Sequence, residues 1–286
     1  MTPNSNLNPL PWYDSIAQQN HRRDYAFGHI YSLITPDRRL LPFQIRRDTR
    51  DANITGVILR NVDGEQIADI TTPMIETGLT IKQFAEYGYD LIIYPGVLPM
   101  AVNTPEGLYY AELTDGTQTW FSEVFNIVRT VDTYMLIEWW DDQPLYFNNS
   151  QIYFDGEKYK NRVYLPTQVG KPEYTFDEDG EDRDGYFFAE KQVSGKTYKF
   201  NFLAPEYLCD AMRIIRMSDH IEITSRGEKY VADTFLITPE WQDQGDLAAV
   251  DAEFETDTVI KKIGLGYIRT KTGDFNNDYN NDFNNG

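Results

Sequence analysis

The sequence predicts a mainly β protein of two β-domains, the second of which carries one amphipathic α-helix. Aromatic side chains make up 14% of the 286 residues, and their flat rings favour the pleated, half-buried surfaces of strands. Short apolar runs are separated by turn signals, among them Asp-Gly pairs that favour tight hairpins. The clearest helical period is that of Leu208, Ala211, Met212 and Ile215, which follow the i, i+3, i+4, i+7 spacing.

The helix is expected over residues 206–217. Pro205 suits the first turn of a helix, and the flanking charges match the helix dipole, with acids near the start (Glu206, Asp210) and arginines near the end (Arg213, Arg216). Strand-like segments precede and follow it. Because a short amphipathic helix cannot bury its apolar face alone, it must pack on the sheet that these strands form.

The predicted order of domains has four parts. They are an extended N-terminal segment over residues 1–24, a β-sandwich over 25–130, the helix-bearing β-domain over 131–265, and a low-complexity tail over 266–286. In the second part, Asp63-Gly64 and Asp115-Gly116 each separate two short strand-like runs. Regularly spaced strands with turn signals between them are typical of an immunoglobulin-like or fibronectin-like sandwich.

The net charge excludes one class of function and suggests a contact. With 26 basic and 45 acidic residues, the chain has a formal charge of −19, so we expect no sequence-specific binding of nucleic acid. Residues 1–50 carry seven arginines against four aspartates, or +3, which leaves −22 for the remainder. Opposite ends could attract head to tail between copies, or the charges could simply be solvated. No apolar run approaches the ~20 residues that span a bilayer, so no membrane insertion is expected.

Both ends of the chain contain candidate partner-binding residues. Trp12 and Tyr13 lie in a polar N-terminal segment followed by the basic pair Arg22 and Arg23. The two aromatic rings are expected either to anchor to a partner or to fold back on their own domain. At the other end, an aromatic residue recurs every fourth position among Asp and Asn, as Phe275, Tyr279 and Phe283. Such a tail forms no core by itself; it is expected either to dock along a neighbouring subunit or to act as a solubilising end.

Motifs that would indicate catalysis or a cofactor are not found, so no enzyme activity and no cofactor are expected. The single cysteine, Cys209, lies beside the apolar face of the predicted helix, where a packing role is favoured over a nucleophilic one. Residues 173–185 are so acidic that they are expected to form a loop. Asp177, Asp179 and Glu181 are weak candidate calcium ligands there, because the segment lacks the Gly and the final Glu of an EF-hand.

Aromatic pairs raise a carbohydrate-binding alternative. Rings of Tyr109-Tyr110, Trp120-Phe121 and Trp139-Trp140 could stack on sugars. Successive residues of a strand point to opposite faces, however, so at most one ring of each pair is presented on a given face. A core role is therefore the favoured interpretation of these residues.

Several phrases of the chain resemble uncharacterised structural proteins encoded by phages and prophages of Bacteroidetes hosts. These phrases are NPLPWYDS, LLPFQIRR, PEGLYYAELTDG, YLPTQVGKPEY, EDRDGYFF, KFNFLAPEYLCDAMRIIRMSD and the DFNNDYNNDFNN ending. In addition, the order strand, helix, hairpin and returning strand over residues 196–261 resembles the fold of tail tube, distal tail and baseplate hub proteins. The resemblance implies a tail-tube-like β-barrel or sandwich for the second domain.

The resemblance implies an architectural role and no catalytic residue. The expected function is a structural component of a phage tail, tail hub or baseplate, located in the virion and in the host cytoplasm during assembly. Its expected partners are copies of itself in a ring and other tail proteins. The alternative is a carbohydrate-binding or receptor-recognition protein built on the sandwich.

Overall fold

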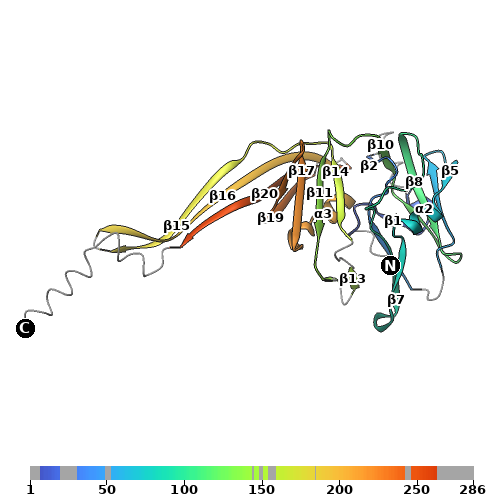
Figure 1. The fold of residues 1–286 in the computed structure, drawn as a ribbon, viewed down its shortest axis with the longest axis horizontal. Coiled ribbons are helices and arrows are strands. Elements are labelled where there is room, and N and C mark those ends of the chain that lie inside the picture. The colour runs from blue at the N-terminus through green and yellow to red at the C-terminus, as the bar shows by residue number, and fades with distance from the viewer. Residues whose placement is uncertain are drawn as a thin grey trace, which may run out of the picture.

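The computed structural model describes residues 7–19, 31–48, 53–143, 145–147, 151–153, 159–183, 185–241 and 246–262. The protein is mainly β, with several sheets and a half-barrel. Figure 1 shows a body built from both halves of the chain, from which three long strands project to one side. Within the described residues, no helix is long and apolar enough to cross a membrane.

Two sheets of the N-terminal half pack face to face as a sandwich. Aromatic rings meet between them, and the centroids of Trp12 and Phe43 are 4.5 Å apart. The larger sheet has seven strands: β1 (Trp12–Tyr13), β2 (Leu33–Pro36), β4 (Gly56–Asn61), β5 (Gln66–Asp69), β8 (Gly107–Thr114), β9 (Thr119–Ser122) and β10 (Phe125–Val128). The smaller sheet has the order β3-β7-β6, formed by Phe43–Arg47, Tyr89–Tyr94 and Thr80–Phe84.

Both Asp-Gly hairpins are confirmed. The turn at Asp63-Gly64 joins the antiparallel strands β4 and β5, and the turn at Asp115-Gly116 joins β8 and β9. Gly64 and Gly116 both have positive φ, as such tight turns require. The sandwich also contains two short helical elements, α2 (Thr71–Glu76) and the 3-10 helix η2 (Ala85–Tyr87).

The C-terminal half contains two four-stranded antiparallel sheets and a small hairpin. The first sheet has the order β14-β11-β17-β18, formed by Asn161–Leu165, Met135–Trp140, His220–Ser225 and Glu228–Val231. The second has the order β15-β16-β20-β19, formed by Glu173–Arg183, Tyr186–Pro205, Leu247–Lys262 and Thr234–Glu240. The hairpin consists of β12 (Leu145–Phe147) and β13 (Gln151–Tyr153).

The predicted helix exists, but it is shorter than 206–217. Helix α3 covers Glu206–Met212, and after a turn the chain tightens into the 3-10 helix η3 (Ile215–Met217). Its four apolar residues Leu208, Ala211, Met212 and Ile215 are all buried, as their spacing predicted. Helix α3 packs against β16 and β19, and η3 packs against β19, so the helical segment covers one face of the second sheet.

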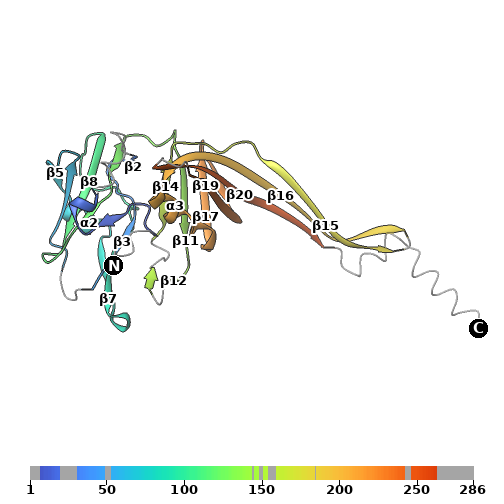
Figure 2. The same ribbon diagram turned by 180° about the vertical axis from the view of Figure 1, so that it is seen from behind.

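The two halves are joined by a common hydrophobic core. Residues of both belong to one cluster of buried side chains, which extends from Leu10 to Phe254. A polar contact adds to this: Arg162 of β14 donates to the carbonyl oxygen of Gly96 at 3.3 Å and pairs with Glu138 at 3.3 Å. Figure 2 shows β14 and β11 lying next to the N-terminal sandwich. The body is thus packed as one unit around this junction.

Three strands continue beyond the body. We call this projection the β-arm; it consists of β15, residues 186–196 of β16 and residues 257–262 of β20. In Figures 1 and 2 it leaves the body at the end of β16 and β20 that is farther from α3, and it extends far from both sheets of the sandwich. Strand β16 has 20 residues and β20 has 16, so the same strands that form the β-arm also enter the core.

Candidate functional site

The β-arm carries an exposed apolar face that continues the core-facing side of its sheet. In the body, Tyr198, Phe200 and Phe202 of β16 are buried. Strand residues alternate between faces, so the even-numbered side of β16 continues outward through Lys196 and Ser194. The strand register places Tyr174 beside Lys196, and Phe176 and Val259 beside Ser194.

The apolar side chains on this face are largely exposed to solvent. Tyr174, Phe176 and Val259 are 74%, 64% and 65% exposed, respectively. The opposite face holds Asp177, Val193 and Ile260 in one cross-strand row. At the far end of the β-arm, where β15 turns into β16, two further aromatic residues are exposed, Tyr186 and Phe187. Exposed apolar groups gathered on one projecting element are typical of an interaction surface.

The acidic segment is a strand, which corrects the expectation of a loop over residues 173–185. Strand β15 covers Glu173–Arg183 and pairs with β16 along its whole length, with one register shift between Asp179 and Gly180. An acidic composition does not prevent a strand here, because the carboxylates of Asp177, Asp179 and Glu181 are exposed and stay hydrated. Among the described residues no group of three or more metal-ligating side chains is found.

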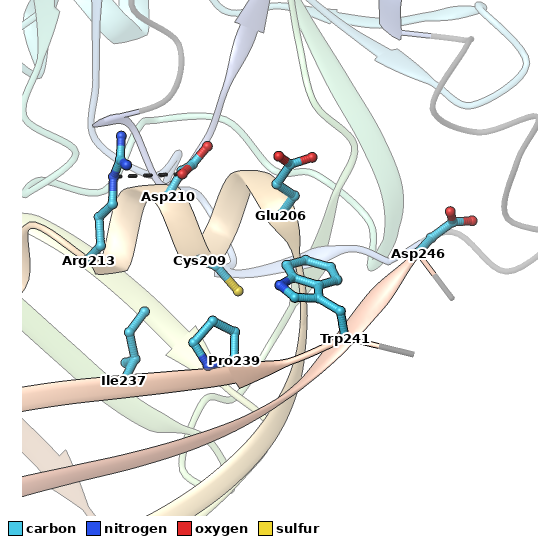
Figure 3. Close-up of a pocket in the computed structure, with 8 residues that line it drawn as sticks. All are labelled: Glu206, Cys209, Asp210, Arg213, Ile237, Pro239, Trp241 and Asp246. Carbon is cyan, nitrogen blue, oxygen red and sulfur yellow. Dashed lines mark ion pairs between the residues drawn. The ribbon is translucent and has the colours of Figure 1, made fainter. Parts of the chain in front are cut away.

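A groove lies between α3 and β19, at the end of their sheet that is farther from the β-arm. It has a volume of about 620 Å³, within the range of about 300–1,000 Å³ that is usual for binding pockets. Ile237, Pro239 and the half-exposed Trp241 form its apolar side. Figure 3 shows Glu206 and Asp210 along the helix and Asp246 beyond Trp241.

The groove carries more negative than positive charge. Its three carboxylates face one cation, Arg213, whose Nε lies 3.7 Å from Asp210. In the part of the chain that the structure describes, Glu206 and Asp246 have no ion-pair partner. The groove therefore offers an aromatic and aliphatic wall with an excess of negative charge, which suits a partner that is both apolar and basic.

Cys209 borders the groove as a packing residue. It is only 8% exposed, and burial raises the pKa of its thiol to about 11, with a further upward contribution from Asp210. Since the thiolate is the nucleophile, a thiol with this pKa reacts poorly near neutral pH. This arrangement supports the packing role that was favoured from the sequence.

We expect native Cys209 to resist alkylation. At about pH 8, its rate of reaction with iodoacetamide should be about 100-fold lower than that of the unfolded chain, because the thiolate fraction falls with the raised pKa. Mass spectrometry of carbamidomethylated protein, with and without guanidinium chloride, measures this. Cys209→Ser is the control for labelling at other groups. Equal rates in both conditions would show an accessible, reactive thiol.

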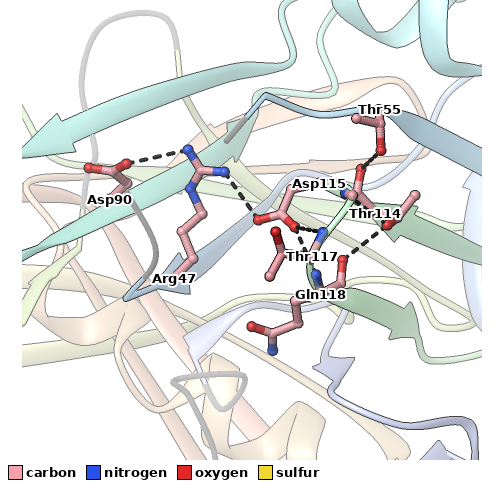
Figure 4. Close-up of polar contacts among 8 residues, drawn as sticks. Arg47, Thr55, Asp90, Thr114, Asp115, Thr117 and Gln118 are labelled. Atoms are coloured by element: carbon pink, nitrogen blue, oxygen red, sulfur yellow. Dashed lines mark hydrogen bonds and ion pairs between the residues drawn. The ribbon is translucent and has the colours of Figure 1, made fainter. Parts of the chain in front are cut away.

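A buried ion cluster connects the two sheets of the sandwich. Arg47 on β3 lies opposite Asp90 on β7, and its guanidinium is 3.3 Å from Asp90 and 3.2 Å from Asp115. Asp115 belongs to the β8–β9 turn and also accepts hydrogen bonds from the backbone N–H groups of Thr117 and Gln118 at 2.9 and 2.8 Å. Figure 4 shows Arg47 between the two carboxylates. The cluster is structural: all three side chains are at most 3% exposed.

The aromatic pairs considered for sugar binding are largely occupied by the protein itself. Tyr109, Tyr110, Trp120 and Trp139 are buried. Trp140 is partly exposed, but the ammonium of Lys160 lies 3.4 Å from its ring centroid, and the imidazole of His220 stacks on it at 4.9 Å. Lys160 directly precedes β14 and His220 belongs to β17, the two strands on either side of β11, so little of this ring is left for a ligand.

Trp12 and Tyr13 fold back on their own domain, which is the second of the two interpretations given for them. They form β1, pair with Ser122 and Phe121 of β9, and are 3% and 8% exposed. The Tyr13 hydroxyl donates to Glu123 at 2.8 Å. Their burial favours this interpretation over that of anchors for a partner. The other predicted contact residues lie outside the described residues: Arg22, Arg23, Phe275, Tyr279 and Phe283.

Sequence reasoning missed both surfaces of the candidate site. The alternation of Tyr174, Phe176 and Glu178 is a signal for a strand, but the surrounding acids concealed it. The groove joins α3 to Trp241 and Asp246, which are distant from it in sequence. The chain matches no protein-family model and no curated protein.

Proposed function

We propose that this protein is a structural component of a tailed-phage virion, in the tail, tail hub or baseplate, and that it assembles through contacts between subunits. The observation that carries this proposal is the β-arm, which extends away from the body with its apolar side chains uncovered. The phrases that resemble phage structural proteins support the same function. No catalytic step and no cofactor form part of the proposal.

The exposed apolar surface of the β-arm favours assembly. A narrow ribbon of two or three strands is only marginally stable unless a face of it is packed against another element. Each apolar side chain that a neighbour covers would contribute about 1.5–3 kcal/mol when fully buried. The exposed rings of Tyr174 and Phe176, on one face of the β-arm, are therefore a surface that gains stability from assembly.

Open strand edges provide a second means of assembly. Strands β15 and β19 are the two edges of their four-stranded sheet, and an unpaired edge can accept a strand of another chain. In the tail-tube-like fold that the sequence resembles, adjacent subunits pair their strands in a ring. Under this proposal, the chain ends that contain Arg22, Arg23, Phe275, Tyr279 and Phe283 add contacts to neighbouring subunits. Under this proposal, the protein assembles in the host cytoplasm and becomes part of the virion.

Removal of the β-arm tests the proposal. Glu173 and Thr197 are register partners at its base, so a short Gly-Ser turn can join them and replace residues 174–196, with the chain ended after Thr256. We expect the full chain to form larger species with increasing concentration in light-scattering measurements, and the shortened chain to stay monomeric. The thermal unfolding of the body, followed by near-ultraviolet circular dichroism, is the control for folding. A full chain that remains monomeric at every concentration contradicts the proposed function.

A further inference from the structure

The groove between α3 and β19 suits an extended segment that is both apolar and basic. Ile237, Pro239 and Trp241 form its apolar side, and its three carboxylates stand against the single cation of Arg213, which leaves a charge of −2. The apolar side follows β19, which is an edge strand of its sheet. An edge strand has unpaired backbone N–H and C=O groups, to which an extended segment can hydrogen-bond.

A segment of this composition directly follows the β-arm. Residues 263–271, which we call the basic segment, come after Lys262, the last described residue, and read IGLGYIRTK. The segment contains two cations and is preceded by two more, Lys261 and Lys262, and no acidic residue occurs between Asp257 and Asp274. Apolar and positively charged side chains thus occur here together, as the groove demands.

The order of residues in the basic segment also fits an extended conformation. Every second residue of a strand points to the same side, so Ile263, Leu265 and Tyr267 would share one side and Arg269 and Lys271 would continue it. On the other side, positions 264 and 266 are glycines, which permit the close approach of another backbone. An extended basic segment therefore presents three apolar side chains followed by two cations.

Local charge decides such a contact, although the whole chain carries −19. Charges farther apart than about 8 Å are largely screened at physiological ionic strength, so the cations of the basic segment would respond mainly to the carboxylates of the groove. Other parts of the chain match the groove less well. The strands of the β-arm carry more acids than bases, and residues 20–30 contain Arg22 and Arg23 against Asp24, or +1.

The basic segment cannot reach the groove of its own chain. Lys262 pairs with Lys191, which precedes Pro205, the residue before α3, by fourteen residues. At roughly 3.3 Å per residue this strand covers about 46 Å, and Figure 1 shows the β-arm directed away from α3 over this length. The five residues from Lys262 to Tyr267 span at most about 18 Å. A basic segment that fills the groove must therefore come from another molecule.

We propose that the basic segment of one copy binds, in an extended conformation, in the α3–β19 groove of a second copy. The inference rests on the proposed function, because it names the surfaces by which the subunits assemble. The apolar residues of the segment cover Ile237, Pro239 and Trp241, and Arg269 and Lys271 lie near the carboxylates. Two different surfaces meet in this contact, so it is heterologous, and its repetition produces a closed ring or a filament.

Site-specific photo-cross-linking tests the contact directly. A benzophenone amino acid in place of Trp241 should cross-link, in a mixture of isotopically light and heavy full-length protein, to residues 263–269 of another copy, which trypsin releases as one peptide. The same probe at Leu236, an exposed residue on the opposite face of β19, is the matched control and should not reach this peptide. Cross-links from position 241 to residues 20–30, to the β-arm, or only to a different added virion protein overturn the proposal. So does the absence of cross-links between copies at concentrations at which light scattering shows assembly.

Two shortened chains provide an independent test. A chain ended after Lys262 lacks the basic segment, whereas a chain ended after Gly273 keeps it and loses only the aromatic repeats. The first should associate at least about tenfold more weakly than the full chain, as expected when central contacts of an interface are lost, and the second should associate as the full chain does. Thermal unfolding, followed by near-ultraviolet circular dichroism, is the control for folding. Equal weakening in both chains would assign the contact to the aromatic repeats and overturn the proposal.

Charge reversal in the full chain separates this contact from assembly in general. Arg269→Glu and Asp246→Lys should each weaken self-association, and the double variant should recover part of the loss. Lys82→Glu, on the sandwich, is the control and should leave association unchanged. Assembly that persists unaltered in both single variants and without residues 263–286 refutes this docking mode while leaving the proposed function intact. A full chain that never associates refutes both.

Discussion

Replacing Arg47 by Met is expected to lower the free energy of unfolding by about 3–5 kcal/mol, the usual cost of leaving a buried charge without its partner. Asp90 and Asp115 are buried on either side of the Arg47 guanidinium. Without it, two carboxylates remain close together in the junction between the sheets. Urea titration followed by circular dichroism measures the loss.

The matched control for this variant lies on the same sandwich. Arg60 pairs with Glu112 at 2.6 Å, but both side chains are about one quarter exposed, at 26% and 23%, so Arg60→Met is expected to cost about 1 kcal/mol or less. The triple variant Arg47→Met, Asp90→Asn, Asp115→Asn should regain much of the lost stability, because no uncompensated charge is left. If Arg47→Met costs no more than Arg60→Met, the cluster does not hold the two sheets together.

The same cluster determines how the sandwich responds to acid. Burial alone raises the pKa of Asp115, but the backbone N–H groups of Gln118 and Thr117 and the Arg47 cation outweigh it, so the pKa lies below its usual value. A carboxyl whose folded pKa is lowered contributes stability above its unfolded pKa of about 3.9, and this stability is lost as pH falls through the folded pKa. Asp115→Asn should therefore reduce the dependence of stability on pH below about pH 4.

Replacing Gly96 by Ala is expected to be the most damaging of the glycine substitutions at the junction of the two halves. Gly96 has φ +59°, and a Cβ atom there would lie 2.5 Å from the carbonyl oxygen of Leu40 and 3.1 Å from the nitrogen of Pro42. The left-handed conformation alone costs an L-residue about 1–2 kcal/mol. The contacts with rigid backbone add to this, so a total loss of roughly 3–4 kcal/mol is expected.

Gly227 provides the comparison that separates conformation from contact. It also has positive φ, at +78°, but no atom of the described residues lies within 4 Å of an added Cβ, so Gly227→Ala should cost only the conformational part of about 1–2 kcal/mol. Because Gly96 also accepts the hydrogen bond from Arg162, Gly96→Ala should increase amide exchange on both sides of the junction. Equal losses of stability in the two variants would show that the backbone around Leu40 moves away from the added Cβ atom of residue 96 at little cost.

Local signals predicted the local parts of this fold well. The Asp-Gly turns determine hairpins within a few residues, and the spacing of Leu208, Ala211, Met212 and Ile215 identifies a buried helical face. The segment over residues 173–183 was misjudged because its composition suggests solvation, whereas its pairing with β16 makes it a strand. Composition reports on hydration, and pairing depends on a partner strand that lies elsewhere in the chain.

The buried ion cluster and the groove were beyond prediction for a similar reason. Arg46 and Arg47 are adjacent and chemically identical, yet Arg47 is buried between sheets while Arg46 pairs with Asp48 near the surface. Alternation along β3 places them on opposite faces, but which face is internal depends on how the sheets pack. The same applies to the groove, whose walls come from α3, β19 and Asp246.

The continuity of β16 and β20 gives the β-arm a mechanical property. An element attached through a loop would act as a tether, but these strands run from the β-arm into the core without a break in the chain. A force along the β-arm acts parallel to the strands and loads the hydrogen bonds between β16 and β20 in shear. Many of these hydrogen bonds must then break at the same time before the strands separate. Force applied to it is transmitted to the sheet beneath α3, and the β-arm can act as a stiff lever between neighbouring molecules.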